Sequence, residues 1–464
     1  MFILNHTDTV PLYKQLYQQI RAQVLSGKLP AHTRLPSVRD LAAELSTSRN
    51  TVDGAYQELA AEGYIYSKER SGYFVSALDH EVAPHAPADK PSQQSRPPRI
   101  SPHCTYDFHP ARLDPASFPA ARWRACFLEC LRGCSRELTH YGDPQGDWGL
   151  RSAIRQYLER SRGVICEPEQ IVICSGLQQG LEIVAQLLQE SHSSVAVEDP
   201  GYHLPRAVFR NHMFRIVPIA VGASGIDLEA LRASDSTIAY VTPSHQLPLG
   251  CVMPIANRLN LIDWAQAGGK LIIEDDYDSE LRYHGKPIPS LQGLRPDGNI
   301  IYTGTFSKIL SPALRLSYMV LPRLLLAPFH ALYRDYFSTV SLLEQKTMAR
   351  FIELGYWERH VRRMRTVYKK KHDALLQAVE RSFGDRATIV GQGAGLHVVL
   401  LLREKNPGEA AILQRATHQG INLFPFSATC ATGKPVPTSL LLGFGGMTVA
   451  EIEQGVKVLS GLCF

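Results

Sequence analysis

Five short apolar segments in the middle of the chain set the strongest limit on its fold. Each is continuously apolar instead of alternating with polar residues, which is typical of strands buried on both faces. Segments with helical periodicity separate them, so the sequence predicts an α/β domain with a mostly parallel sheet. After about residue 351 the pattern indicates a long helix and a smaller α+β region. The five segments are IVIC (171–174), VAVE (195–198), IAYV (238–241), LIIE (271–274) and IIYT (300–303).

A segment rich in proline, serine and glutamine divides the chain. Residues 77–104 carry few large apolar side chains, so we predict a semi-extended linker there. The linker separates a predicted N-terminal domain, residues 1–76, from a predicted C-terminal domain, residues 105–464. The total length of 464 residues is ordinary for a protein of two or three domains.

The compartment and the role of the cysteines are predicted from composition. No run of about 18 apolar residues is present, and the N-terminus becomes polar too soon for a signal peptide, so we expect a cytoplasmic protein without a membrane span. Nine scattered cysteines do not suggest a disulfide framework. Cys126, Cys130 and Cys134 recur at every fourth residue, which fits either a metal cluster or small side chains on one helix face. Zinc sites favour CxxC pairs, so we predict no metal site.

The first 76 residues are predicted to form three helices and a hairpin. A first helix begins near Pro11, SVRDLAAEL forms a second, and SRNTVDGAYQELAAEG forms a third with Ser48 as its N-cap. The segment YIYSKERSGYFVS then alternates into a two-stranded ribbon. A short helix, a tight turn and another helix make a helix-turn-helix arrangement, whose second helix enters the major groove of DNA.

The start of the third helix carries side chains that can read bases. Arg49 can bind guanine through two hydrogen bonds, Asn50 can bind adenine similarly, and Thr51 offers a methyl or hydroxyl contact. Charge does not decide the matter, because residues 1–76 hold eight Lys and Arg against seven Asp and Glu. Many three-helix domains bind no DNA, so these residues alone leave DNA binding and a purely structural role both open.

Reactive and polar residues follow the strands of the predicted sheet. Lys308 follows IIYT, Asp275 follows LIIE, Tyr202 follows VAVE, and SGLQQG (175–180) joins IVIC to a helix. The carboxyl ends of parallel strands meet at one edge, where such sheets hold ligands. Pyridoxal phosphate needs an amine for its aldehyde, a carboxylate at its ring nitrogen and backbone amides at its phosphate. Taken singly, the same signals fit a surface lysine, a magnesium site at EDDYD (274–278) and an ordinary turn.

The N-terminal pattern resembles a known family. LPSVRDLAAELSTSRNTVDGAYQELAAEGYI (35–65) is similar in spacing to the winged helix of GntR-type transcription regulators, and the resemblance covers about residues 11–76. It implies binding to double-stranded operator DNA. The residues implied are Arg39, Ser48, Arg49, Asn50, Thr51 and, in the wing, Arg70 and Gly72.

The C-terminal region, from about residue 106 to residue 464, resembles the fold type I aminotransferases, which depend on pyridoxal phosphate. The resemblance implies that Lys308 forms the Schiff base with the cofactor, Asp275 pairs with the ring nitrogen and Tyr277 donates to the ring 3-oxygen. His245, in TPSHQLPLG, lies near the position where aminotransferases keep an asparagine. The remaining cofactor-binding residues implied are Tyr202, Gly176, Leu177, Gln178, Thr305 and Arg315.

Both halves together resemble the MocR/GabR branch of GntR regulators. The resemblance implies a homodimer, compatible with a head-to-tail exchange of DNA domains, that binds operator DNA and is nucleoid-associated when it does. Its aminotransferase-like domain would respond to pyridoxal phosphate itself or to an amino-acid or amine effector, and so control vitamin B6 or amine metabolism genes. The alternative is an active aminotransferase with an accessory DNA-binding domain.

One departure from the aminotransferase pattern counts against steady turnover. Aminotransferases hold the substrate carboxylate with an arginine in a strand that reads roughly RLGF, but here the strand is SLLLGFGG (439–446) and the matching residue is Leu441. Leucine offers no paired donors to a carboxylate. Either Arg206 binds the effector instead, or the effector has no carboxylate at that point. At most, a residual transaminase half-reaction is expected.

Overall fold

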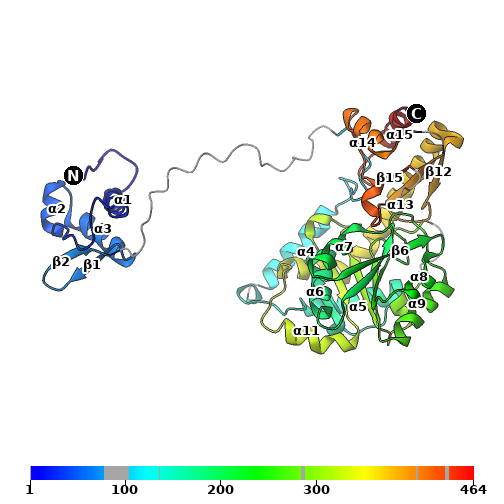
Figure 1. The fold of residues 1–464 in the computed structure, drawn as a ribbon, viewed down its shortest axis with the longest axis horizontal. Coiled ribbons are helices and arrows are strands. Elements are labelled where there is room, and N and C mark those ends of the chain that lie inside the picture. The colour runs from blue at the N-terminus through cyan, green and yellow to red at the C-terminus, as the bar shows by residue number, and fades with distance from the viewer. Residues whose placement is uncertain (1, 78–103, 135, 284–287, 404–405, 434–437) are drawn as a thin grey trace. The chain divides into compact units, whose positions relative to one another are not determined.

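The computed structural model describes residues 2–77, 104–134, 136–283, 288–403, 406–433 and 438–464. The chain forms two compact units, Met1–Ile100 and Ser101–Phe464, which are drawn in Figure 1. Apart from its two end residues, the linker predicted for residues 77–104 lies outside the described residues. The domain boundaries proposed from the sequence therefore stay predictions.

The first unit contains the predicted three helices and hairpin. The helices are α1 (Leu12–Leu25), α2 (Val38–Glu44) and α3 (Arg49–Ala61), and the strands β1 (Ile65–Lys68) and β2 (Gly72–Val75) pair antiparallel. Its core gathers buried side chains from every element, including Leu16, Leu41 and Leu59. The Tyr56 hydroxyl donates to the Pro36 carbonyl oxygen over 3.1 Å, which ties α3 to the segment that leads into α2.

The second unit is built on an eight-stranded sheet with the order β4-β11-β10-β9-β8-β5-β6-β7. Strands β6, β5, β8, β9 and β10 pair parallel in that order, whereas β11 is antiparallel to both β10 and β4. The predicted mostly parallel α/β sheet is therefore confirmed. The strands are β4 (Ile171–Cys174), β5 (Ser194–Asp199), β6 (Arg215–Gly222), β7 (Gly225–Ile226), β8 (Ile238–Val241), β9 (Leu271–Asp276), β10 (Ile300–Thr305) and β11 (Ser317–Val320).

The continuous apolar character of the central strands follows from burial on both faces. In β8, Tyr240 packs into a cluster with α6 and α7 on one face, whereas Ala239 and Val241 pack with α9 on the other. The helices that cover the sheet or follow it are α4 (Ala120–Gly133), α5 (Trp148–Arg162), α6 (Leu177–Leu188), α7 (His203–Asn211), α8 (Leu228–Ala233), α9 (Ile255–Ala267), α10 (Leu291–Leu294), α11 (Leu326–Leu332), α12 (Leu342–Glu353) and α13 (Tyr356–Phe383).

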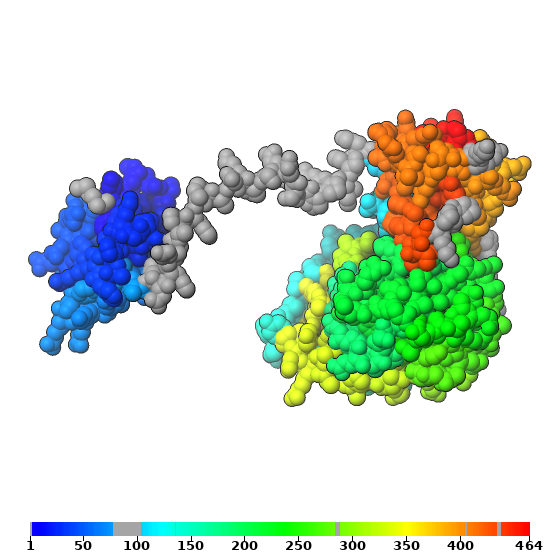
Figure 2. Space-filling view, in the orientation of Figure 1, coloured from blue at the N-terminus to red at the C-terminus, as the bar shows by residue number. Residues whose placement is uncertain are grey.

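A smaller subdomain follows the long helix α13, as predicted. An antiparallel sheet of β12 (Ala387–Val390), β13 (His397–Leu402) and β15 (Ser439–Gly443) packs with α14 (Glu409–His418) and α15 (Val449–Cys463). A two-residue strand β14 (Ile421–Asn422) pairs with β3 (Tyr106–Asp107) near the start of the unit. Figure 2 shows this orange and red subdomain in contact with the green body of the sheet.

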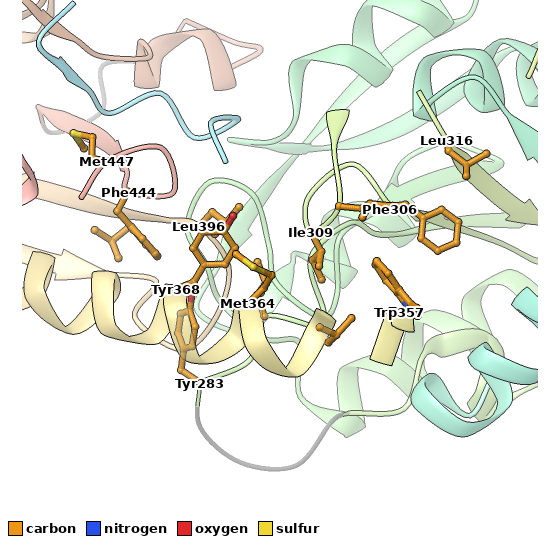
Figure 3. Packing of buried hydrophobic residues seen from close by; sticks show 14 of the residues in the cluster. Tyr283, Phe306, Ile309, Leu316, Trp357, Met364, Tyr368, Leu396, Phe444 and Met447 are labelled. Carbon is orange, nitrogen blue, oxygen red and sulfur yellow. The ribbon is translucent and has the colours of Figure 1, made fainter. Parts of the chain in front are cut away.

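Helix α13 locks the segment after β10 into the core. Trp357 of this helix meets the Phe306 ring edge-on, with 5.1 Å between ring centroids, and His360 lies 3.0 Å from the Ile309 carbonyl oxygen. Figure 3 shows Phe306, Ile309 and Trp357 in one continuous packing with Met364 and Phe444. None of the described helices is both long and apolar enough to cross a membrane.

Candidate functional site

A cavity of about 360 Å³ opens at the carboxyl ends of the parallel strands. It is lined by residues from the large sheet, by the loop after β3 and by the small subdomain. Nine residues proposed from the sequence lie together on its wall: Gly176, Leu177, Gln178, Tyr202, Asp275, Tyr277, Thr305, Lys308 and Arg315. His245 and Arg206 do not line it.

Asp275 presents a buried carboxylate to this cavity from the end of β9. It accepts a hydrogen bond from Thr303 Oγ1 over 3.2 Å and another from the Tyr240 hydroxyl, both of them neutral donors. Burial raises the pKa of Asp275 to about 7, and the two hydroxyl donors only partly oppose that rise. The carboxylate therefore faces the cavity without a cation that fully compensates its charge.

The other carboxylates of EDDYD point elsewhere, because side chains alternate along a strand. Glu274 accepts from the Leu291 amide over 2.8 Å at the start of α10, and Asp276 forms a buried ion pair with Arg162 at 2.6 Å. Among the described residues no group of three or more possible ligands could hold a metal ion. The magnesium alternative for this segment therefore finds no support in the geometry.

Lys308 extends into the cavity between two core anchors, the buried side chains of Phe306 and Ile309. Its ammonium group lies 5.8 Å from the centre of the Tyr277 ring. Burial lowers the pKa of Lys308, while the carboxylates Asp278 and Asp275 act in the opposite direction. A lowered pKa increases the fraction of free amine, which is the nucleophilic form.

Behind Tyr277 lies a small hydrogen-bonded group. His245 Nδ1 is 2.8 Å from Asp278 Oδ2 and 3.1 Å from the Tyr277 hydroxyl. An ionised carboxylate can only accept hydrogen bonds, so Asp278 favours the His245 tautomer with the proton on Nδ1. The Tyr277 hydroxyl lies beside both His245 and Asp278 and is hydrogen-bonded in this group. His245 therefore lies one hydrogen bond behind the cavity wall and positions Tyr277.

The opposite end of the cavity is suited to an anion. Helix α6 begins there at Leu177, so its first amides lack intrahelical partners and carry the positive end of the helix dipole. Gly176 has φ +85°, a backbone conformation that favours glycine, and a Cβ at this residue would displace the Arg315 guanidinium. Thr305 Oγ1 accepts from the Ser317 hydroxyl over 2.7 Å.

The two residues weighed for carboxylate binding have other roles in the structure. Arg206 is buried and donates to the Thr429 carbonyl oxygen over 3.1 Å and to that of Ala428 over 2.7 Å. It thus holds the turn η7 (Phe426–Thr429) of the small subdomain. Leu441 lines the cavity and is only 1% exposed.

Several residues that line the cavity or support its wall were not predicted from the sequence. Tyr240 and Thr303 lie next to Asp275 on neighbouring strands, and only the strand order brings them there. His109, His203 and Phe424 come from segments far apart in the chain. Asp278 did carry a signal, since it belongs to the acidic segment EDDYD, and His245 was named as a site residue, but the contact between the two was not predicted.

On the first unit, the predicted base-reading side chains are exposed at the start of α3 and nearby. The side chains of Arg39, Arg49 and Asn50 are exposed and form no ion pair or hydrogen bond within the described part of the chain. Ser48 and Thr51 differ, because Ser48 Oγ accepts the Thr51 amide over 3.1 Å and lies 2.8 Å from Thr51 Oγ1. Their first role is to cap the helix.

The predicted wing is the turn between β1 and β2. Arg70 has φ +59° and Gly72 has φ +99°. This left-handed backbone closes the hairpin tightly, and the Ser71 amide donates to the Lys68 carbonyl oxygen over 2.9 Å. The Arg70 side chain is left exposed at the tip.

Two family models match the chain in the same order as its units. Residues 12–75 match the bacterial regulatory proteins of the gntR family, and residues 113–459 match aminotransferase class I and II. A solved structure of kynurenine aminotransferase from Pyrococcus horikoshii is 26% identical with a TM-score of 0.70, covering 77% of this chain and 90% of that one. The chain therefore joins a gntR-type DNA-binding unit to an aminotransferase-fold unit.

Whole-length relatives define the family more closely. The HTH-type transcriptional regulator YdeL of Bacillus subtilis is 40% identical over 98% of this chain and 97% of its own. The probable rhizopine catabolism regulatory protein MocR of Rhizobium meliloti is 34% identical over 99% and 95%. The pyridoxine biosynthesis regulator PdxR of Corynebacterium glutamicum is 31% identical over 98% of each chain. The chain belongs to the MocR/GabR subfamily of GntR-type transcriptional regulators.

Proposed function

We propose that this regulator binds pyridoxal phosphate in the cavity of its second unit and uses the occupied site to control how its first unit binds operator DNA. The observation that carries the proposal is the joint position of Lys308, Asp275 and the α6 amides on one cavity wall. We also propose a cytoplasmic homodimer, in line with the fold type I resemblance.

The residues of the cavity fit this cofactor. Asp275 is a buried carboxylate that lacks a full cationic partner, which suits a protonated ring nitrogen. The Gly176 turn and the first amides of α6 suit a phosphate group. Pyridoxal phosphate supplies an aldehyde that condenses with amines and a ring that withdraws electrons.

Each side chain then has a distinct part. With the cofactor bound, Lys308 would supply the amine that holds the aldehyde, Asp275 would keep the ring nitrogen protonated, and Tyr277 would donate its hydroxyl to the ring 3-oxygen. Thr305 and Arg315 would bind the phosphate beside Gly176, Leu177 and Gln178, and Tyr202 would contact the ring. His245 acts on the ring only through Tyr277.

A homodimer has support from an exposed aromatic cluster, which we define as Tyr141, Trp148 and Phe337. Tyr141 is 82% exposed and stacks on Phe337 with 4.3 Å between ring centroids. Single exposed apolar residues are ordinary, but a cluster of large rings commonly marks an interface.

The cofactor proposal is tested with purified protein freed of cofactor. Titration with pyridoxal phosphate should produce a saturable visible absorbance, and borohydride reduction followed by peptide mass mapping should place the added mass on Lys308. DNA mobility shifts with and without the cofactor then test the regulatory part. Protein that stays colourless and gains no mass at Lys308 would disprove the proposal.

An active aminotransferase is the second candidate, because Lys308, Asp275 and Tyr277 are all retained in the cavity. The buried Leu441 opposes it. Steady conversion of an amino acid and a keto acid, well above the rate of free cofactor, would favour the enzyme, whereas at most one half-turnover per site favours the regulator.

A further inference from the structure

The cavity has a second wall that none of the proposed cofactor contacts occupies. It comes from the loops after β3 and β8, from α7, from the segment after β14 and from β15. We call it the effector wall and define it by His109, His203, Leu204, Leu247, Phe424 and Leu441.

The effector wall is made of rings and leucines. Phe424 is the centre of the ring cluster, at 5.3 Å from the His109 ring and 5.8 Å from the His203 ring, measured between centroids. His203 in turn meets Tyr202 at 5.1 Å. The aromatic surface therefore runs without a break from the small subdomain to the residue that covers the cofactor ring.

This wall offers no fixed positive charge. Among the described residues that line the cavity, the Lys and Arg side chains are Lys308, which holds the aldehyde, and Arg315, at the phosphate end. Burial lowers the pKa of both His109 and His203, which favours the neutral form of each imidazole. Arg206 lies behind the wall with its donors on carbonyl oxygens.

Leu441 makes the wall unfavourable for a carboxylate. It packs with Val399 and Phe426 in a small buried cluster, at the position where the aminotransferase pattern has an arginine. A carboxylate placed there would lose its water and gain no charged donor, and burying an unpaired charge is costly.

We propose that the ligand taken beside the cofactor is a primary amine with an aromatic or apolar body and no carboxylate next to the amino group. This inference rests on the proposed function, since the amine takes the place of Lys308 on the cofactor aldehyde. In that exchange one carbon–nitrogen bond would form as another breaks, and Lys308 would be released as a free amine. No oxidant or reductant is needed.

Matched pairs that differ only in the carboxylate test this directly on the full-length protein loaded with cofactor. The pairs are 2-phenylethylamine with L-phenylalanine, and histamine with L-histidine. The readouts are the visible spectrum of the bound cofactor and the DNA mobility shift. We expect each amine to reach half-saturation at a concentration about tenfold or more below that of its amino acid. Equal or tighter binding of the amino acids would overturn the inference.

Variants locate the selectivity on the effector wall. Leu441→Arg should reverse the preference toward the amino acid in each pair, whereas Leu441→Met, which keeps the volume and adds no charge, should leave it unchanged. Since an arginine at a buried position can prevent folding, Leu204→Arg supplies a second cation from a partly exposed side chain of the same wall. If both single variants, Leu441→Arg and Leu204→Arg, fold and bind the cofactor but still prefer the amine, the effector wall does not select the ligand.

Failure of this inference is distinguishable from failure of the proposed function. If the protein never becomes coloured with pyridoxal phosphate, the proposed function fails. If it becomes coloured and neither amines nor amino acids change the spectrum, the amine inference fails while cofactor sensing stands, with pyridoxal phosphate alone as the signal.

Discussion

Arg49 and Asp275 occupy opposite settings in the two units. The Arg49 side chain is exposed at the start of α3 and has no hydrogen-bond partner among the described residues, whereas Asp275 is buried and held by Tyr240 and Thr303. DNA is densely charged and binds to the protein surface, so the side chains that read it can be solvent-exposed before binding. A small ligand has few groups, so its site must be fixed in advance. Substitution of an exposed reading residue such as Arg49 should therefore change DNA binding alone, whereas substitution of a buried site residue such as Asp275 should change both binding and stability.

The largest expected effect is on the cavity side of this comparison. Lys308→Ala should abolish the visible absorbance of the protein with pyridoxal phosphate and the borohydride-dependent mass on the chain, because no other lysine lines the cavity within the described residues. Lys370→Ala removes the same charge from an exposed position on α13 and should change neither signal. If the Lys308→Ala variant still absorbs visible light with pyridoxal phosphate and still gains mass on borohydride reduction, Lys308 is not the residue that holds the cofactor.

On the DNA side, Arg49→Ala should weaken operator binding by about 1–3 kcal/mol, or roughly 5- to 150-fold, if the side chain reads a base. Its removal should leave the free energy of unfolding within about 0.5 kcal/mol of the original, since the side chain is exposed and has no hydrogen bond or ion pair among the described residues. Quantitative DNA mobility shifts and denaturant unfolding measure the two quantities.

Lys28→Ala is the matched control for Arg49→Ala, because it removes one exposed positive charge from the same unit away from α3. It should lower operator affinity less and equally for all DNA sequences. Equal losses for the two variants would show that Arg49 contributes charge and not recognition.

The sequence predicted part of the cavity in the second unit but missed several of its strands and contacts. Continuous apolar strands and the residues at their ends predicted that Lys308, Asp275 and Tyr202 come together with the turn at residues 175–180, because parallel strands end at one edge. The resemblance to aminotransferases was needed to add Thr305 and Arg315. The strands β6 and β11 were not predicted: β6 contains Pro218, which is unusual inside a strand, and β11 is a short antiparallel strand between two others. Tyr240 and Thr303 lie beside Asp275 because of the order of the strands in the sheet, which the sequence did not predict. His109, His203 and Phe424 come together only through tertiary packing.

Because the Asp275 carboxylate is buried, the free energy of unfolding should depend on pH. Its pKa is about 7 in the folded protein and about 4 when unfolded, so between these values the folded form binds a proton that the unfolded form does not. The stability contributed by this residue therefore falls as the pH rises from about 4 to about 7 and stays low above that. Asp275→Asn should stabilise the cofactor-free protein by on the order of 2 kcal/mol at pH 8, and by progressively less toward pH 4.

The same Asp275→Asn variant should lose affinity for pyridoxal phosphate, so stability and binding move in opposite directions. Denaturant unfolding across the pH range, without cofactor, gives the first quantity, and absorbance titration gives the second. A variant that is less stable than the original at pH 8 would show that the carboxylate is already compensated inside the protein.

The smallest expected effect concerns Ser48, which is exposed beside the reading residues but also stabilises the start of α3. Its hydroxyl caps α3 through the Thr51 amide, so Ser48→Ala should destabilise the first unit by about 1 kcal/mol. Ser48→Asp keeps a capping oxygen and favours the helix dipole, so stability should return, but the added negative charge faces the DNA and should weaken operator binding. If Ser48→Ala instead weakens DNA binding while the unfolding free energy is unchanged, Ser48 acts on the DNA directly. In that case it would belong with Arg49 as a reading residue.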